Sequence, residues 1–114
     1  MEHRFDPLLV AAGGFVGAVL RYGVDVAVPG VGGTLAVNVL GSFALGALLV
    51  VVRRHHVRLL LGTGLLSSFT TYSTFAVQTA SLPPRLAVAN VAANYVLGLL
   101  AVLAGRRVVG GVVA

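Results

Sequence analysis

The 114-residue sequence contains no cysteine and no lysine, and its carboxylate side chains are only Glu2, Asp6 and Asp25. Without cysteine the chain forms no disulfide and no thiolate metal site. No carboxylate lies at the centre of an apolar segment, and no histidine lies near the serine-rich part of the chain, so neither paired acid–base chemistry nor a serine–histidine nucleophile is expected. We therefore expect no enzyme.

Charged residues make up 10% of the chain and apolar residues 58%, with a mean hydropathy of +1.01. The apolar residues form four segments of membrane-spanning length, at about 8–28, 33–52, 59–82 and 86–105. The first segment is longer than a signal peptide and another span follows it closely, so we expect it to be retained. The sequence predicts an all-α membrane protein with a single four-helix transmembrane domain over residues 1–114.

The third segment has an unusually polar centre. Seven of the eight residues at 67–74 carry a hydroxyl. In hydrocarbon such groups must face protein, water or an ion path, and crowded serine and threonine side chains compete for backbone groups, which predicts a break in this helix. The rings of Phe69, Tyr72 and Phe75 recur every three residues, and ring edges beside hydroxyl donors suit a small anion, whereas carbonyls freed at a break suit a cation. The alternative is ordinary hydroxyl back-bonding and ring packing.

Other polar residues lie inside the remaining segments. Asn38 in the second segment is either a link between helices or a ligand. Asn90 and Asn94 are four residues apart, so they share one helix face, which must be covered by protein. Gly13 and Gly17 form a small-xxx-small pattern that lets another helix approach closely.

Arg21 and Asp25 share a face in the last third of the first segment. Two interpretations stay open for them, snorkelling or a structural ion pair, and a role at a pore mouth. His55 and His56 are adjacent in a basic loop, with no carboxylate near them in the sequence, so we expect solvated side chains and no metal site.

The arginines lie mainly at segment ends. The positive-inside rule of membrane topology explains them there, so we do not expect nucleic acid as a partner. With four spans, both termini and the loop at 53–58 share one side. That side carries Arg4, Arg53, Arg54, Arg58, Arg106 and Arg107, whereas Arg85 alone lies on the other. This bias predicts cytoplasmic termini and a single orientation.

Three stretches of the chain match one known family. They are Gly-Gly-Phe-Val-Gly-Ala at 13–18 followed by Arg21-Tyr22, Val-Asn-Val-Leu-Gly-Ser-Phe at 37–43, and Thr-Thr-Tyr-Ser-Thr-Phe at 70–75. With these motifs in order on four spans, the chain resembles the CrcB/Fluc family of fluoride-specific ion channels over nearly its whole length. The resemblance implies a dimer of antiparallel four-helix subunits in a prokaryotic plasma membrane, with passive fluoride export and fluoride resistance as its function.

The resemblance also implies roles for individual residues. Tyr72 and Phe75 correspond to the two aromatic residues that line a fluoride path, with Ser73 and Thr74 between them on its polar track. Asn38 corresponds to the pore asparagine. Donors of this kind suit fluoride, whose tightly held water the path must replace without binding the ion too strongly.

Three further positions follow from the resemblance. Arg21 corresponds to the family's arginine in the first segment, which we assign to the pore mouth. Backbone carbonyls of Ser67 and Thr70 correspond to the ligands of a structural sodium ion at the dimer interface.

The chain departs from the family at Tyr72, where phenylalanine is usual, at Ser67 and Ser68, where glycines are usual, and after Tyr95, where hydroxyls are missing. Together with the charge bias, these departures favour an antiparallel heterodimer with a paralogue, and a dimer of identical chains is the alternative.

Other functions give different expectations. A small multidrug-resistance transporter also has four spans, but it needs a carboxylate inside the membrane. A non-conducting partner subunit of a heterodimeric fluoride channel is a further alternative. A purely structural membrane subunit predicts small apolar residues at the centre of the third segment, which this chain does not have.

Overall fold

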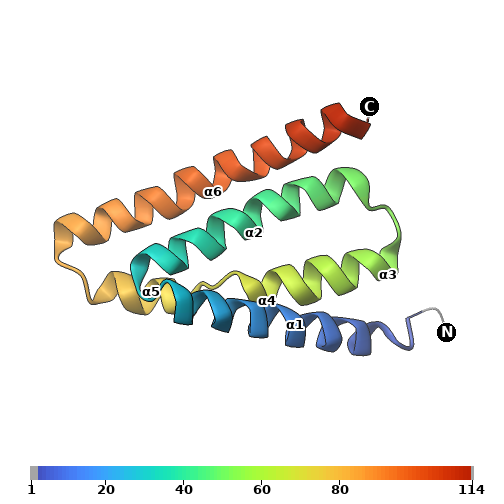
Figure 1. Cartoon of the computed structure of the whole chain (residues 1–114), viewed down its shortest axis with the longest axis horizontal. Helices are drawn as coiled ribbons and strands as arrows, with labels where there is room; N and C mark the ends of the chain where they lie inside the picture. The colour runs from blue at the N-terminus through green and yellow to red at the C-terminus, as the bar shows by residue number, and fades with distance from the viewer. Residues whose placement is uncertain (1–2, 114) are drawn as a thin grey trace.

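The computed structural model describes residues 3–113 (Figure 1), and every regular element in that part of the chain is a helix, as predicted. The elements are α1 (Asp6–Ala27), α2 (Val31–Val51), α3 (His55–Arg58), the π-helix η1 (Leu59–Leu66), α4 (Ser67–Phe69), α5 (Ser73–Ala80) and α6 (Pro84–Val113). Helices α1, α2 and α6 are each long and apolar enough to cross a membrane. The third apolar segment is divided among α3, η1, α4 and α5.

Proline and glycine set the limits of the first two long helices. Helix α1 begins at Asp6, whose carboxylate lies in the first turn, and Pro7 follows at a position that needs no backbone N–H donor. Pro29 disfavours a helical conformation at the residue before it, so α1 ends at Ala27. Gly30 then has φ 90°, which a residue with a side chain rarely adopts. This turn lets α2 begin at Val31.

Arg58 closes the far end of α2. Its Nε donates to Val52 O at 2.7 Å and its Nη2 donates to Leu49 O at 3.1 Å. A cation at a helix C-terminus satisfies carbonyls that have no partner in the helix and also complements the helix dipole. Arg58 therefore joins the third segment to the end of α2.

Helix α6 extends further than expected. We predicted that the fourth segment ends at about residue 105, before Arg106 and Arg107, but α6 continues through both residues to Val113. Arginine is a good helix former, and no proline interrupts the chain after it. The 30 residues of α6 rise by about 45 Å, which exceeds the ~30 Å of bilayer hydrocarbon. Its last turns therefore extend beyond the span.

The helices form two closely packed pairs. Helix α2 lies along α6, and α1 lies along η1 and α4 (Figure 1). A Cβ atom added at Gly13 or Gly17 would collide with backbone oxygens of η1, at Leu60 and Leu65 respectively. The small-xxx-small pattern in α1 thus marks a close helix contact, as predicted. In the other pair Gly46 lies against the backbone of Val102.

Both termini and the connection between α2 and α3 lie at one end of the molecule, and the turns at 28–30 and 81–83 lie at the other (Figure 1). The chain measures 50 × 32 × 23 Å, so it is only about two helices thick. Among the described residues the buried apolar side chains are only Val37, Phe75 and Ala101. Most of the apolar surface therefore faces outward, where lipid or another chain covers it.

Candidate ion path

The third segment breaks where its hydroxyl run predicted. Helix α4 ends at Phe69 and α5 begins at Ser73, while Thr70 is extended with φ −76° and ψ 161°. The eight residues before α4 form the π-helix η1, a rare form that is frequent at functional sites. Peptide groups at the break lose their helical partners, so they need other ones.

Asn38 of α2 supplies two of these partners. Its Oδ1 accepts a hydrogen bond from the Thr71 N–H at 2.8 Å, and its Nδ2 donates to Thr71 O at 3.1 Å. The same Nδ2 donates to Asn94 Oδ1, also at 3.1 Å. One side-chain amide therefore holds both peptide groups of a single residue in the break and links them to α6.

The polar contacts continue along α6 to α5. Asn94 Nδ2 donates to Asn90 O at 2.9 Å and to Asn90 Oδ1 at 3.1 Å. Asn90 Nδ2 donates to Thr79 Oγ1 at 2.9 Å, and that hydroxyl donates to Phe75 O at 2.7 Å. The predicted shared face of Asn90 and Asn94 is thus covered by protein, and a directed hydrogen-bond chain connects the break to the helix after it.

The aromatic residues meet at the start of α5. Phe75 is 7% exposed, and its ring centroid lies 5.9 Å from that of Tyr72 and 6.2 Å from that of Tyr95. The planes of Phe75 and Tyr95 are at 81°, an edge-to-face arrangement. Phe69 lies before the break, beside Gly41 of α2. The break therefore separates Phe69 from the other two rings that the sequence placed on one face.

A cavity of about 570 Å³ lies beside this group. It is lined by Asn38, Gly41, Ser42, Leu45, Gly62, Leu66, Ser67, Thr70, Thr71, Tyr72, Phe75, Asn94, Tyr95, Gly98, Leu99 and Val102. These lining residues include hydroxyl, amide and aromatic groups but no charged side chain. Because Ser67, Tyr72 and Tyr95 are exposed, the cavity reaches the surface of the chain.

The hydroxyl run serves several purposes. Ser67, Ser68 and Thr70 donate to carbonyls one turn earlier, at Thr63, Gly64 and Leu66, which is the ordinary back-bonding named above as the alternative. Ser68 also donates to Gly14 O of α1 at 2.9 Å.

The hydroxyl of Thr71, in the break, has a different role. Its Oγ1 accepts from the Thr74 N–H at 3.2 Å, in the first turn of α5. Ser73 is exposed at the start of α5, and Thr74 is half-buried.

Ser67 begins the three-residue α4 and Thr70 directly follows it; both line the cavity, with Ser67 exposed and Thr70 half-buried. The last turn of a helix has carbonyls without helical donors and attracts cations. Thr70 Oγ1 approaches Ser67 O at 3.4 Å, which is a long contact. Backbone oxygens of this kind fit a hard cation such as sodium.

Arg21 and Asp25 are half-buried in the last turns of α1. Within residues 3–113 the structure records no ion pair between them. The ion-pair interpretation is therefore not supported, whereas snorkelling and a pore-mouth role stay open.

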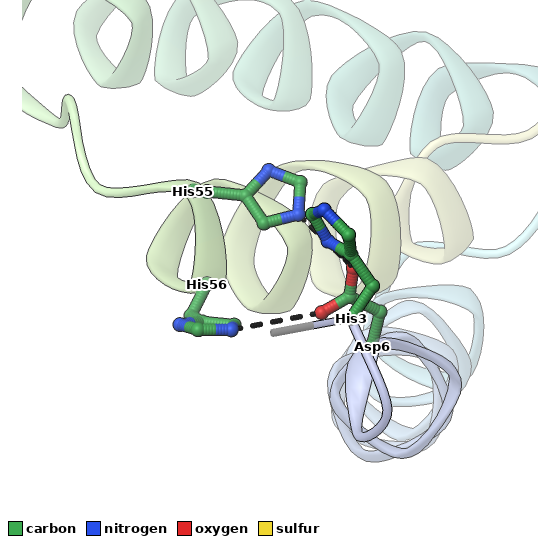
Figure 2. Close-up of polar contacts among 4 residues, drawn as sticks. All are labelled: His3, Asp6, His55 and His56. Carbon is green, nitrogen blue, oxygen red and sulfur yellow. Dashed lines mark hydrogen bonds and ion pairs between the residues drawn. The ribbon is translucent and has the colours of Figure 1, made fainter. Parts of the chain in front are cut away.

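The expectation that no carboxylate lies near His55 and His56 is wrong, although both side chains are exposed as expected. Asp6 lies among His3, His55 and His56, although it is 49 residues from His55 in sequence (Figure 2). A carboxylate is thus available to both loop histidines. The packing of α1 along the third segment places it there.

Three residues of the path were not singled out from the sequence as site residues, namely Thr71, Asn94 and Tyr95. Asn94 and Tyr95 had a signal, because an amide and an aromatic side chain adjoin each other on the protein-facing part of the fourth segment. Thr71 was one hydroxyl among many in the run.

Comparisons with known proteins cover most of this chain. Residues 8–106 match the family model described as CrcB-like protein, Camphor Resistance (CrcB). A relative from Halobacterium salinarum, named fluoride-specific ion channel FluC 2, is 58% identical over 106 residues that cover 88% of this chain and 83% of the relative. Fluoride-specific ion channel FluC 1 of Natronomonas pharaonis is 53% identical over 108 residues, which cover 89% of this chain and 91% of the relative. The match runs from α1 into α6, and the chain belongs to the CrcB family.

Proposed function

We propose that this chain is a subunit of a passive, fluoride-selective channel that exports fluoride and so protects the cell. Membership of the CrcB family and the names of the relatives support fluoride as the ion. The cavity beside Phe75 carries the proposal within the chain, because its lining offers hydrogen-bond donors and ring edges without any charged side chain. A path of this kind replaces the water of a small anion and still releases it.

Phe75 and Tyr72 present their rings to the ion, and Ser73 and Thr74 supply the hydroxyls of the polar track. The burial of Phe75 and its edge-to-face contact with Tyr95 support a fixed ring position. A fixed ring is useful because the attraction of an anion to a ring edge depends on orientation.

Asn38 acts in two ways in this proposal. Its Nδ2 already donates to Thr71 O and Asn94 Oδ1, so an anion that binds the amide competes with two oxygens. Competition of this kind keeps the binding weak, as conduction requires. Arg21, near the end of α1, attracts anions to the pore mouth.

The second subunit lies antiparallel against the open side of the cavity. Ser67, Tyr72 and Tyr95 are exposed on a single chain. Polar groups at membrane depth must be covered by protein. A sodium ion held by the carbonyls of Ser67 and Thr70 would supply charge stabilisation at this interface.

The arginines support a paralogue as the partner. Six arginines lie in the N-terminal segment, the connection at 53–58 or the last part of α6, whereas Arg85 lies beside the turn at 81–83. This bias favours insertion with cytoplasmic termini in the plasma membrane of a prokaryote, whereas identical antiparallel chains need a bias near zero.

A proton-coupled exporter is the competing function. It needs a carboxylate within the span, but Asp6 and Asp25 lie in the first and last turns of α1. The structure of the path thus favours passive conduction over coupled transport.

The test is fluoride efflux from loaded liposomes, measured with a fluoride electrode, for the purified chain alone and with a co-encoded relative. We expect fluoride efflux without a pH gradient and little chloride efflux. Efflux only with the relative supports the heterodimer and identifies this chain as a required partner. Equal chloride and fluoride efflux, or efflux that depends on a proton gradient, contradicts the proposal.

A further inference from the structure

We propose that His3, Asp6, His55 and His56 form a binding site for a divalent transition metal that prefers imidazole ligands, with zinc as the representative ion. The cluster (Figure 2) lies where α1 and α3 begin, at the end of the molecule that holds both termini (Figure 1) and away from the path. It joins the residues before α1 to the beginning of α3.

The distances within the cluster are short. Asp6 Oδ2 lies 2.9 Å from His3 Nδ1 and 3.0 Å from His55 Nε2. Asp6 Oδ1 lies 3.7 Å from His56 Nε2. One ligand atom each from His3, Asp6 and His55 lie within 4.8 Å of one another. Three imidazoles thus surround one carboxylate, and Figure 2 shows their rings turned toward it.

Hydrogen bonding does not account for both carboxylate oxygens. Asp6 Oδ2 accepts from two rings, whereas Oδ1 is buried and makes no hydrogen bond within residues 3–113. A buried carboxylate oxygen without a donor is unfavourable. A cation between Oδ1 and the facing imidazole removes this cost.

The ligand spacing suits zinc. Ligands at about 2.0–2.1 Å from a tetrahedral zinc ion are about 3.3 Å apart. The separations of 2.9, 3.0 and 3.7 Å between Asp6 oxygens and the three ring nitrogens lie on both sides of that value. The ligand atoms of His3, Asp6 and His55 lie within 4.8 Å of one another, so the side chains shift to meet at one ion. The three imidazoles are each more than half exposed, so an ion reaches them from solvent.

The donor set selects the class of metal. Imidazole nitrogens suit zinc, copper and nickel, whereas magnesium and calcium prefer oxygen ligands. The chain has no cysteine, so any tightly bound zinc must use histidine and carboxylate groups. A bound ion would fasten the start of α1 to α3 and so strengthen the packing of α1 along η1.

The experiment uses the full chain without a histidine tag, purified in detergent and stripped with a chelator. Zinc is titrated against a chromophoric indicator. We expect one zinc per chain, and we expect Asp6→Asn to weaken the affinity at least ~10-fold, since even the loss of a partner of a metal ligand has an effect of that order. Asp25→Asn makes the same change at the other end of α1 and leaves the affinity unchanged.

Folding is monitored by elution volume and thermal unfolding, and His56→Gln, a change at an exposed side chain, is the second variant. It lowers the affinity without changing elution. With copper as the probe, electron paramagnetic resonance shows coupling to imidazole nitrogen in the parent and reduced coupling in His56→Gln. The proposal is overturned if the parent binds no zinc in competition with the indicator, if Asp6→Asn or His56→Gln binds as the parent does, or if Asp25→Asn weakens binding equally.

Discussion

Asn38 holds Thr71 through two hydrogen bonds, one to its N–H and one to its carbonyl, and we call this pair of bonds the clamp. The substitution Asn38→Asp tests its role. Aspartate has nearly the same shape as asparagine, and its Oδ1 still accepts from the Thr71 N–H, which lies at 2.8 Å in the parent. The donor, however, is replaced by a second oxygen. That oxygen faces Thr71 O and Asn94 Oδ1, each of which lies 3.1 Å from the amide nitrogen in the parent. The change therefore turns two hydrogen bonds into contacts between acceptors.

The expected destabilisation is about 4 kcal/mol, from ~0.6 kcal/mol for each lost interhelical hydrogen bond and ~3 kcal/mol for a carboxylate inside the span. On the scale of a domain of this size, the Tm falls by ~15 °C or more. Gln78→Glu is the matched control. It makes the same amide-to-carboxylate change in α5, where Gln78 Oε1 has no hydrogen-bond partner within residues 3–113, so it measures the cost of the charge alone.

The assay combines thermal unfolding in detergent with fluoride efflux from liposomes. Asn38→Asp should lose both efflux and thermal stability, and its Tm should fall further than that of Gln78→Glu. If Asn38→Asp unfolds at the parent temperature, the clamp does not stabilise the break. If it also conducts at the parent rate, Asn38 has no part in the path.

Phe75→Ile removes the ring edge but keeps apolar bulk. Fluoride efflux should therefore be strongly reduced, while the free energy of unfolding falls by only ~1 kcal/mol. Efflux at the parent rate contradicts the assignment of the ring to the path. Gly17→Val should prevent monodisperse elution because its side chain meets Leu65 O and Ser68 Oγ, whereas Gly23→Val, with open space around the new Cβ, should elute normally. Gly32→Cys, at an exposed position in the first turn of α2, should be labelled by an impermeant thiol reagent on intact cells and Arg54→Cys should not; equal labelling at both sites indicates dual insertion.

Much of the fold follows from the sequence because the bilayer imposes it. A segment of about 20 apolar residues must be helical to satisfy its backbone in hydrocarbon, and an even number of spans places both termini at one end. The break was also predictable, since the crowded hydroxyls at 67–74 compete with the helix for backbone groups. The end of α6 was not predictable, because no proline stops the helix at Arg106 and Arg107 and it continues beyond the span.

The partners of the polar side chains were less predictable than the side chains themselves. Asn38 and Asn94 are 56 residues apart, and Asp6 and His55 are 49 apart. Such contacts depend on which helices pack together and on their rotation, and four apolar segments allow several packings. The glycines at 13 and 17 indicated a close contact but not that η1 makes it. For the same reason a carboxylate beside His55 was missed.

The clamp explains how the residues on the two sides of a broken helix keep fixed positions. A break in hydrocarbon is costly because each unsatisfied peptide group costs several kcal/mol. Asn38 satisfies both groups of Thr71, and Thr71 Oγ1 in turn accepts from the Thr74 N–H at the start of α5. The position of Phe75 is thereby tied to α2 across the break rather than to α4 along the chain. The carbonyls of Ser67 and Thr70 lie outside this clamp, in residues that line the cavity. In the proposed channel they are the groups left for a cation and a second subunit, so the clamp and the interface divide between them the polar groups that the break exposes.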